Sequence, residues 1–343
     1  MLKKIFLGTL AGITLIGVAG ALYVYSAINK DIDEHFAGVC TDLPLEGSGE
    51  DIQLDRDRGL AFLSVFDRKA VASGETPGPG DIMVVDLNSN PPAVRSALVS
   101  RPEHMHPHGI SMFIDADGQR SLIMINHPED RENGQETIER FVEVSPGQYR
   151  YTEGLQSPLI TRANDLVAVG PRQFYVAQDT GQGTGQTVTD LVYFDGEDFS
   201  VVANDIESGG GINVSADNTT LYIAETNAKA IRVAALNSDD GSITQLKRIE
   251  LDSSPDNINV AADGALIVGA HSNLIALVMH FIAGSDAPTQ VLRVEPNEDP
   301  AIIEEIYLNR GTEISAGSGA VSYGNKLLIG SITDKKILIC ESE

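Results

Sequence analysis

Short apolar runs separated by polar turns recur along the chain from about Glu50 to the C-terminus. Examples are residues 81–87, 220–224 and 326–330, and turn sequences such as Ala262-Asp263-Gly264 precede several runs. The runs are too short for helices and are rich in Val and Ile, and no long segment has the pattern of an amphipathic helix. Many short strands joined by such turns predict an all-β sandwich, barrel or propeller.

A repeated unit decides among these three architectures. Polar residues open apolar strands at Asn164-Asp165, Gly211-Ile212-Asn213 and Asp256-Asn257, and each strand is followed by a polar turn and a second strand. The openings at residues 164, 211 and 256 lie 47 and 45 residues apart, which is the period of a propeller blade. About 300 residues at this period make six blades, so the sequence predicts a six-bladed β-propeller over residues 38–343.

The polar residues that open these strands are candidate metal ligands. The first strand of each blade lines the central channel, so its opening residues should gather at one mouth of that channel. Carboxylate and amide oxygens suit Ca²⁺, which takes six to eight oxygen ligands. Each residue could instead cap its own turn, but three pairs at equivalent places favour calcium. The candidates are Glu50, Asp51, Asn164, Asp165, Asp256 and Asn257.

The charge of the chain narrows the list of partners. It carries 49 acidic and 24 basic residues, a formal net charge of −25. Such a chain repels polyanions, which argues against nucleic acid or an anionic membrane surface as a partner. A solvated acidic surface accounts for most of this charge, and a cation site is compatible with it. Zinc is not expected, because the histidines lack the spacing of zinc ligands.

The N-terminus predicts export. Lys3 and Lys4 precede an uncharged stretch from Ile5 to Ile28, and acidic residues follow between positions 31 and 34. This stretch is long enough to span a bilayer, with the N-terminus in the cytoplasm. A cleaved signal peptide with a site near residues 19–21 is the alternative. Residues 1–30 are therefore expected to form a hydrophobic anchor helix or signal sequence, with the propeller periplasmic or extracellular.

Two cysteines, Cys40 and Cys340, lie near the two ends of the exported part. In an oxidising compartment a bridge between them would close the propeller ring covalently. The alternative is a pair of unrelated buried thiols. Export favours the bridge.

A Pro-His-Gly turn at residues 107–109 leads into an apolar strand. His108 could simply fill this turn, or it could stand at the floor of a pocket, held rigidly by the strand. The chain has no Gly-x-Ser-x-Gly motif, so the nucleophile signature of an α/β-hydrolase is missing.

Several motifs, in this order and spacing, resemble the paraoxonase family of arylesterases and lactonases, and the resemblance covers about residues 38–341. It rests on Gly49-Glu50-Asp51, Pro107-His108-Gly109-Ile110-Ser111, Asn126-His127-Pro128, Asn164-Asp165-Leu166-Val167, Gly211-Ile212-Asn213 and Asp256-Asn257-Ile258. The resemblance implies a six-bladed propeller with two calcium ions in its channel. It also implies hydrolysis of aryl esters and of small hydrophobic lactones, acyl-homoserine lactones among them.

The resemblance also implies roles for single residues. His108 matches the active-site histidine of the family, and His127 matches its partner in a proposed dyad. A catalytic calcium ion would be held by Glu50, Asn164, Asp256 and Asn257. A deeper structural ion would be held by Asp51, Asp165 and the main-chain carbonyl of Ile110. The ion would polarise the substrate carbonyl while His108 helps to deprotonate a water molecule.

The chain departs from the family pattern at several places. Gly210 stands where the family has a further calcium-binding Asn, and either Asn213 or water could fill the gap. Ala270 replaces a cysteine before His271, a residue that either lines the pocket or packs beside it. Residues 181–189 are rich in Gly, Gln and Thr where the family has an aromatic helix. A sugar lactonase of the gluconolactonase type, or a calcium-stabilised propeller that binds a ligand without turnover, is therefore an alternative.

Overall fold

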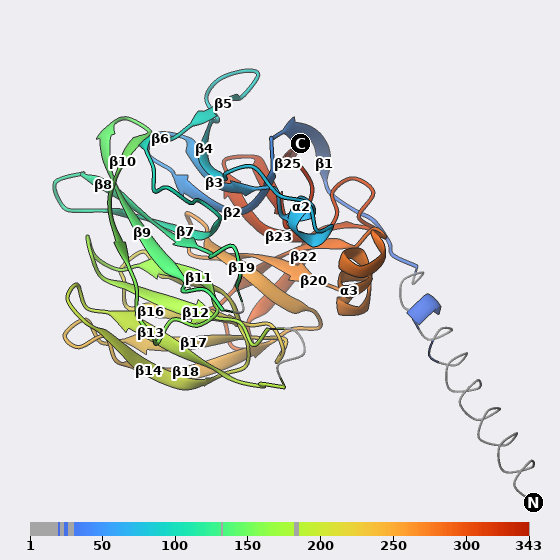
Figure 1. Ribbon diagram of the computed structural model, residues 1–343. Helices are drawn as coiled ribbons and strands as arrows, with labels where there is room; N and C mark the ends of the chain where they lie inside the picture. Colours follow the sequence, from blue (N-terminus) through green and yellow to red (C-terminus); the bar gives the residue numbers. More distant parts are fainter. Residues whose placement is uncertain (1–19, 21–23, 27–30, 132, 182–184, 343) are drawn as a thin grey trace, which may run out of the picture.

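Six β-sheets are arranged radially around a central channel in the computed structural model, which describes residues 20, 24–26, 31–131, 133–181 and 185–342 (Figure 1). The fold is the predicted all-β six-bladed propeller. The innermost strands of adjacent blades contact one another around the ring. These six strands are β2(Ser48–Asp55), β7(Pro107–Ile114), β11(Ala163–Ala168), β15(Gly209–Val214), β19(Ser254–Val260) and β23(Gly317–Tyr323).

The first three blades follow one another along the chain. Blade 1 contains β2(Ser48–Asp55), β3(Leu60–Phe66), β4(Asp81–Asp86) and β5(Ala93–Ser96). Blade 2 contains β7(Pro107–Ile114), β8(Arg120–Asn126), β9(Thr137–Ser145) and β10(Gln148–Leu155), with β6(Leu98–Ser100) added in parallel to β10. Blade 3 contains β11(Ala163–Ala168), β12(Phe174–Gln178), β13(Thr189–Phe194) and β14(Phe199–Ile206).

The last three blades complete the ring. Blade 4 contains β15(Gly209–Val214), β16(Thr220–Glu225), β17(Ala230–Leu236) and β18(Ile243–Glu250). Blade 5 contains β19(Ser254–Val260), β20(Leu266–His271), β21(Thr289–Glu295) and β22(Ile302–Asn309). Blade 6 contains β23(Gly317–Tyr323), β24(Lys326–Ser331) and β25(Lys336–Ser342), and its outer strand is β1(Gly38–Pro44) from the start of the chain.

The two ends of the propeller are joined in blade 6. Strand β1 pairs antiparallel with β25, and Cys40 lies directly opposite Cys340 in that pairing. The two residues form a disulfide, which confirms the predicted bridge. The ring is therefore closed both by main-chain hydrogen bonds and by a covalent bond.

The hydrophobic core lies between blades. Each of the six apolar clusters spans two neighbouring sheets, as where Ile123 and Ile138 of blade 2 pack with Leu166 and Val176 of blade 3. A propeller sheet is buried on both faces by its neighbours, which explains why its central strands are nearly continuous apolar runs. The channel is thus surrounded by a rigid, closely packed ring.

All innermost strands begin at the same face of the ring, called here the mouth face. Because neighbouring strands of a blade are antiparallel, the second strand of each blade ends at the mouth face. The connection to the third strand therefore also lies there. Two such connections contain helices, α2(Arg68–Ala72) in blade 1 and α3(Leu274–Ala283) in blade 5.

Helix α3 was not expected from the sequence, because its residues are apolar on all sides. Its ends nevertheless carry local signals. The side chain of Asn273 accepts a hydrogen bond from the Ala276 N–H at the N-terminus, and Gly284 ends the helix in the left-handed conformation. These two residues fix where the helix begins and ends.

Most of the expected anchor, Ile5 to Ile28, lies outside the described residues. Within the residues that are described, no helix is long and apolar enough to cross a membrane.

Candidate active site

In all six blades the innermost strand contains one extra residue near its start. In each blade the register between the first and second strands shifts by one residue there. Such β-bulges redirect side chains and are common beside active sites. The residues at the bulges are Glu50-Asp51, His108-Gly109, Asn164, Gly210-Gly211, Asp256-Asn257 and Ser318-Gly319. Most of the predicted site residues are therefore bulge residues.

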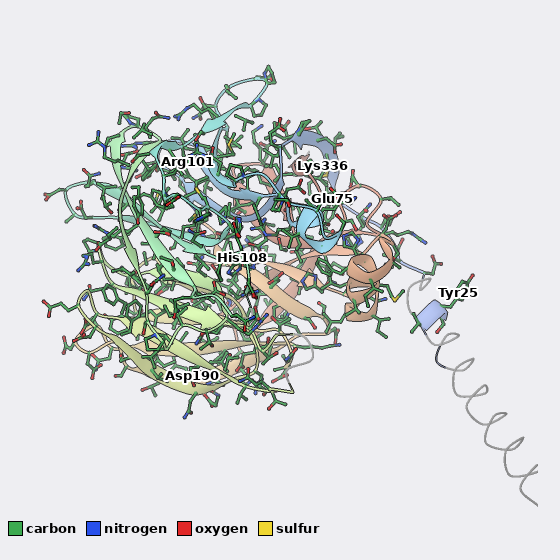
Figure 2. All side chains as sticks on the ribbon, viewed as in Figure 1. Tyr25, Glu75, Arg101, His108, Asp190 and Lys336 are labelled. Atoms are coloured by element: carbon green, nitrogen blue, oxygen red, sulfur yellow. A yellow bond between two sulfur atoms is a disulfide. The ribbon has the colours of Figure 1, made fainter. Side chains whose placement is uncertain are left out.

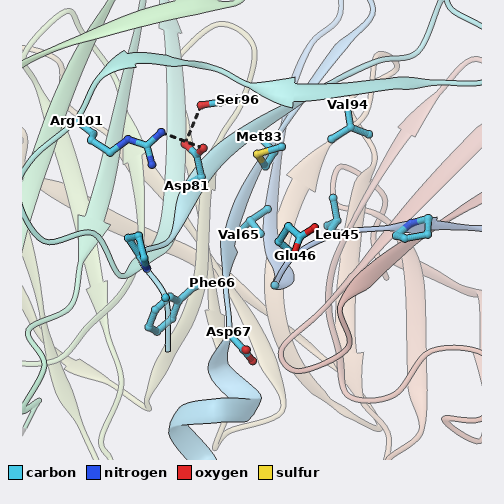
Figure 3. Close-up of a pocket in the computed structure, with 14 residues that line it drawn as sticks. Leu45, Glu46, Val65, Phe66, Asp67, Asp81, Met83, Val94, Ser96 and Arg101 are labelled. Carbon is cyan, nitrogen blue, oxygen red and sulfur yellow. Dashed lines mark hydrogen bonds and ion pairs between the residues drawn. The ribbon is translucent and has the colours of Figure 1, made fainter. Parts of the chain in front are cut away.

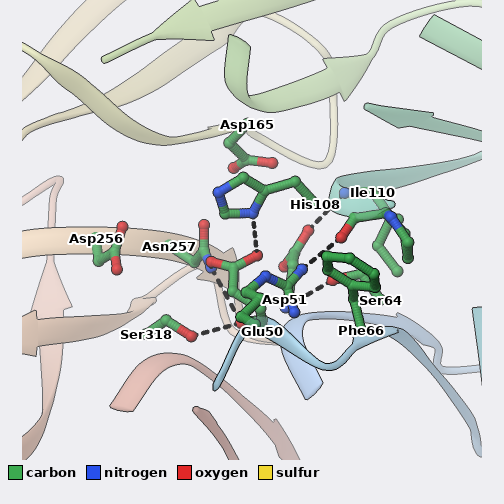
Figure 4. A network of polar contacts seen from close by, with 12 residues as sticks. Glu50, Asp51, Ser64, Phe66, His108, Ile110, Asp165, Asp256, Asn257 and Ser318 are labelled. Carbon is green, nitrogen blue, oxygen red and sulfur yellow. Dashed lines mark hydrogen bonds and ion pairs between the residues drawn. The ribbon is translucent and has the colours of Figure 1, made fainter. Parts of the chain in front are cut away.

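Glu50 is the centre of a buried polar network at the mouth face (Figure 4). One carboxylate oxygen, Oε2, lies 2.7 Å from Nδ1 of His108, and the other, Oε1, accepts a hydrogen bond of 2.9 Å from the Asn257 amide. Ser318 donates to the main-chain carbonyl of Glu50. Burial by itself raises the pKa of Glu50, but His108 and Arg68 outweigh it and hold the pKa at about 2. Glu50 thus connects blades 1, 2, 5 and 6.

Asp51 and Asp165 form an equivalent pair of buried carboxylates in blades 1 and 3. Asp51 accepts hydrogen bonds from the N–H groups of Ile52 and Ile110, and Asp165 accepts them from Leu166 and Ile212. Each carboxylate therefore ties its own strand to the innermost strand of the next blade. Burial, together with the charge of Glu50, raises the pKa of Asp51 to about 8, and burial with the charge of Asp51 raises the pKa of Asp165 well above its usual range.

The remaining predicted oxygen ligands lie at the same mouth. Asp256 is buried, and its Oδ2 lies 3.0 Å from Nε2 of His271, the last residue of β20. The Oδ1 atom of Asn164 is buried and has no hydrogen-bond partner among the described residues. No three His, Cys, Asp or Glu side chains in the described ranges could hold a metal ion by themselves. The predicted set, however, also includes two amides and a carbonyl.

His108 and His127 come together as the resemblance implied. Their rings meet edge to face, with centroids 4.7 Å apart. Both side chains are only slightly exposed, at 14% and 15%. His108 is placed by the bulge in β7, whereas His127 directly follows β8, whose last residue, Asn126, pairs with Pro107. The two histidines therefore lie side by side because the two strands that carry them are paired.

A third member of this group, Glu136, was missed by the sequence analysis. Its Oε2 lies 2.6 Å from Nδ1 of His127, and its Oε1 accepts a bond of 3.1 Å from Arg131. Asp179 directly follows β12 of blade 3 and accepts hydrogen bonds from two arginines. Arg131 donates to it over 3.0 Å and Arg162 over 2.8 Å. No motif marks Glu136, because it lies in an irregular connection. The one signal in the sequence is that the nine residues that follow His127, up to Glu136, include Gly and Asn, which indicates a turn that can bring the two side chains together.

Burial changes the charge state of this second group. It raises the pKa of Glu136 to about 7, despite the opposing effect of Arg131. Burial and the positive charge of Arg131 lower the pKa of His127 well below its usual value. His127 is therefore neutral at physiological pH, and its Nε2, which has no hydrogen-bond partner among the described residues, is available as a base.

Arg68, the first residue of α2, was also missed. Its guanidinium donates to Ser48 and to the main-chain carbonyl of Pro107, the residue before His108. The charge of Arg68 also acts on Glu50 and Asp51. The connection that follows β3 thus brings a positive charge to the mouth of the channel.

Gly210 and Asn213 adopt arrangements that the sequence left open. Both ends of the Asn213 amide are used by main-chain groups, those of Ile258 and Val214, so this side chain links β15 to β19. A Cβ atom on Gly210 would lie 2.4 Å from Oγ1 of Thr226 and 3.2 Å from Oδ1 of Asp256. Thr226 therefore occupies space beside Asp256 that a larger residue 210 would need.

The mouth network lies near the middle of the ring, as the position of His108 in Figure 2 shows. A separate hollow of about 690 Å³ lies on the flank between blades 1 and 6 (Figure 3). It is lined by Leu45, Phe66 and Met83, with Asp81 bound to Ser96 and Arg101 at one side. None of the predicted site residues lines this hollow, so its size is no guide to the chemistry.

Comparison with known proteins agrees with the resemblance. Residues 44–342 match the arylesterase family. The chain is 31% identical to human serum paraoxonase/arylesterase 2 over 98% of this chain and 100% of the relative. It is 32% identical to human serum paraoxonase/lactonase 3 over 87% of this chain and 86% of the relative.

A solved structure of a putative gluconolactonase shares the fold, with a TM-score of 0.54 and 15% identity over 90% of this chain and 94% of that one. At that identity the likeness concerns the fold alone. The family match over nearly the whole propeller, together with relatives above 30% identity, shows that this chain belongs to the arylesterase family.

Proposed function

We propose that the chain is a hydrolase of lactones and aryl esters that acts at the mouth of the propeller channel. Membership of a family whose relatives are named arylesterases and lactonases supports the reaction class. The observation that carries the proposal is the pair His108 and His127, in edge contact and flanked by the buried carboxylates Glu50 and Glu136. The chemistry needs a base beside the site where water attacks the ester.

The residues of this pair have separate roles in the proposed reaction. The Nδ1 atom of His108 is engaged by Glu50, so its Nε2 remains for the attacking water. An ionised Glu136 can only accept a hydrogen bond, which places the hydrogen of neutral His127 on Nδ1 and leaves Nε2 unprotonated. His127 is then a neutral ring in edge contact with His108, and its lowered pKa suits it to orient His108 and not to hold a second positive charge beside it.

The donor set at the mouth fits a hard cation. The unpartnered, buried Oδ1 of Asn164 is one sign, and the raised pKa values of Asp51 and Asp165 are another, since they show more buried negative charge than the protein neutralises. The paraoxonase family is calcium-dependent in general. Glu50, Asn164, Asp256 and Asn257 would hold a catalytic ion, and Asp51, Asp165 and the Ile110 carbonyl a second. Bound calcium supplies Lewis-acid polarisation of the ester carbonyl.

The proposal extends to where the enzyme acts. The disulfide indicates an oxidising compartment, so the propeller is exported. The uncharged stretch from Ile5 to Ile28 would anchor it to a membrane, with the propeller on the extracytoplasmic side.

The test is hydrolysis of lactones and aryl esters with calcium and with chelator, by the wild type, His108→Gln and Asn257→Ala. We expect a loss of at least about 100-fold in kcat/KM for His108→Gln. Asn257→Ala should raise the calcium concentration needed for half-maximal protection from thermal unfolding. His104→Gln, an exposed histidine on the same segment, is the matched control and should match wild type.

Two results would refute this proposal. If calcium-replete wild type hydrolyses neither substrate class, the chain is a propeller that binds without turnover. If chelator changes neither unfolding nor activity, the calcium assignment is wrong.

A second candidate, a sugar lactonase of the gluconolactonase type, is favoured by the polar surroundings of the mouth. The two histidines are surrounded by charged side chains, which suit hydroxyl-rich substrates better than long acyl chains. These side chains are Arg68, Arg131, Arg162, Glu136 and Asp179. Comparing kcat/KM for long-chain acyl-homoserine lactones and for sugar lactones separates the two functions. A preference of tenfold or more for sugar lactones would establish this second one.

A further inference from the structure

Blade 4 has no polar side chain at its bulge, in contrast to the other five described blades. Its bulge residues are Gly210 and Gly211, whereas the bulges on either side of it in the ring carry Asn164 in blade 3 and Asp256 with Asn257 in blade 5. Because the six bulges surround the channel mouth, the ring of side-chain donors has a gap between Asn164 and Asp256.

Thr226 reaches this gap from the second strand of the same blade. It directly follows Glu225, the last residue of β16, which pairs with Gly209 at the start of β15. Its main-chain N–H donates to the carbonyl of Ser208 over 3.0 Å, and its hydroxyl donates to the carbonyl of Pro255 over 2.8 Å. Thr226 is therefore fixed between the openings of blades 4 and 5.

The Thr226 hydroxyl supplies an oxygen at the distance from Gly210 that an Asn side chain would give. A Cβ atom on Gly210 would lie 2.4 Å from Oγ1 of Thr226. Standard bond lengths place the amide oxygen of an Asn side chain about 2.4 Å from its own Cβ. The hydroxyl oxygen is therefore as far from position 210 as the oxygen of an Asn at that position would be.

Asp256 borders the same space as this hydroxyl. The same Cβ position on Gly210 is 3.2 Å from Oδ1 of Asp256. The other carboxylate oxygen, Oδ2, lies 3.0 Å from Nε2 of His271, so Oδ1 is the oxygen that remains for a cation. Figure 4 shows Asp256 on the blade 5 side of the mouth network. The Thr226 hydroxyl and Oδ1 of Asp256 thus lie near one common point.

The Thr226 oxygen remains an acceptor. A Thr hydroxyl has one hydrogen and two lone pairs. Its hydrogen is committed to the Pro255 carbonyl, which leaves the lone pairs for a cation. Ca²⁺ takes six to eight oxygen ligands, and neutral oxygens complete its shell beside the carboxylates.

We propose that Oγ1 of Thr226 is a ligand of the catalytic calcium ion and supplies the donor that the bulge of blade 4 lacks. The inference rests on the proposed calcium site and goes beyond it by one residue. Asn213, the other candidate in blade 4, does not take this role because its amide is bound to main-chain groups of Ile258 and Val214. An ion held in this way would also fix the turn that Thr226 begins, so that blade 4 joins blades 1, 3 and 5 in binding it.

The test measures calcium binding to the full chain without reference to activity. Calcium is titrated into chelator-treated protein, and the concentration that gives half-maximal protection from thermal unfolding is recorded. Thr226→Val keeps the shape of the side chain but removes the oxygen, and it should raise that concentration about tenfold. Thr226→Ser retains the oxygen and should stay within about twofold of wild type. Thr244→Val, on the exposed outer strand β18 of the same blade, is the matched control and should not differ from wild type.

A second readout counts the water molecules on the ion. Tb³⁺ replaces Ca²⁺ at oxygen sites, and its luminescence lifetimes in H₂O and D₂O give the number of bound waters. We expect about one more water in Thr226→Val than in wild type, because water fills a vacated ligand position. Thr226→Ala serves as a second variant if Thr226→Val does not fold.

The outcomes separate this inference from the calcium assignment. If chelator leaves wild-type unfolding unchanged, the calcium assignment is wrong and the inference falls with it. If calcium protects wild type and Thr226→Val at the same concentration, with equal water counts, the calcium assignment holds and Thr226 is not a ligand. A drop in melting temperature that is equal with and without calcium would leave the hydroxyl only its bond to Pro255, which also overturns the inference. Equal calcium affinities of Thr226→Ser and Thr226→Val would do the same.

Discussion

Glu136 decides which nitrogen of His127 carries the hydrogen, although no sequence motif marks it. Its 2.6 Å contact with Nδ1 and its own contact with Arg131 hold the imidazole in place. A carboxylate that orients a catalytic histidine acts through that histidine, so Glu136 is a positioning residue. Its pKa of about 7, raised by burial, makes this role dependent on pH.

The pH dependence has a definite sign. Below about pH 7 Glu136 is protonated and donates its O–H to Nδ1, so that the hydrogen of His127 moves to Nε2 and this atom no longer accepts a proton. We therefore expect kcat/KM to rise as the pH increases through about 7. In Glu136→Gln this limb should disappear, with a loss of about tenfold above pH 8. Measured pH profiles check this, with the exposed Glu129→Gln as control. An unchanged limb in Glu136→Gln would contradict it.

Gly210 permits a second prediction at a single position. The family has a calcium-binding Asn where this chain has Gly210, and Thr226 fills the adjacent space. In Gly210→Asn alone, Thr226 should obstruct the new side chain. In Gly210→Asn combined with Thr226→Ala, the calcium concentration that gives half-maximal protection from thermal unfolding should fall about tenfold. Thr226→Ala alone is the control; if it lowers that concentration equally, the added amide is not a ligand.

At the bulges of β7 and β15 the neighbouring innermost strand is so close that the bulge needs glycine. A Cβ on Gly109 would lie 2.6 Å from the Cα of Asp165, and one on Gly211 would lie 2.4 Å from the main-chain oxygen of Asp256. Main-chain atoms cannot rotate away as a side chain can. The glycines therefore allow the inner strands to converge, and this convergence brings Glu50, His108 and Asn257 into contact.

Gly211→Ala should therefore lower the free energy of unfolding by about 1–3 kcal/mol, because the added methyl group forces β15 away from β19. Urea unfolding measures this change. Gly78→Ala is the control, since nothing lies within 4 Å of its added Cβ, and its stability should stay within about 0.5 kcal/mol of wild type. Equal stability of the two variants would show that the strands can separate without cost.

The ring as a whole depends on its closure in blade 6. Each hydrophobic cluster is shared by two blades, so opening the ring at one place exposes the clusters on both sides of the break. Strand β1 closes this place with hydrogen bonds, and the Cys40–Cys340 disulfide holds it there across 300 residues of chain. A bridge over so long a loop acts mainly on the unfolded chain.

In the double variant Cys40→Ser, Cys340→Ser the propeller should still form, because the pairing of β1 with β25 remains. Its free energy of unfolding should fall by up to about 5 kcal/mol. Denaturant unfolding of this variant, and of wild type in reductant, measures the loss, and the two should agree. A loss below about 1 kcal/mol would mean that hydrogen bonding alone closes the ring.

Local patterns were sufficient to predict the architecture. The blade period, the apolar strands and the two terminal cysteines predicted six blades and their covalent closure, because these features are written in spacing along the chain. The resemblance placed Glu50, His108, His127 and Asn257 in one site, and the structure brings these four together. Irregular connections were not predictable in this way, since a loop has no hydrophobic period.

The sequence by itself determined the propeller, its ring closure and the family to which it belongs, because strand period, turn chemistry and motif order are properties of neighbouring residues. Only the tertiary structure decided that Glu136 and Arg131 support His127, that Arg68 reaches Ser48 and Pro107, and that Thr226 occupies the space beside Gly210. It also decided that the apolar run at 274–283 is a helix. Each of these depends on irregular connections or on contacts between residues that lie apart in the sequence, and hydrophobic periodicity along the chain does not specify either.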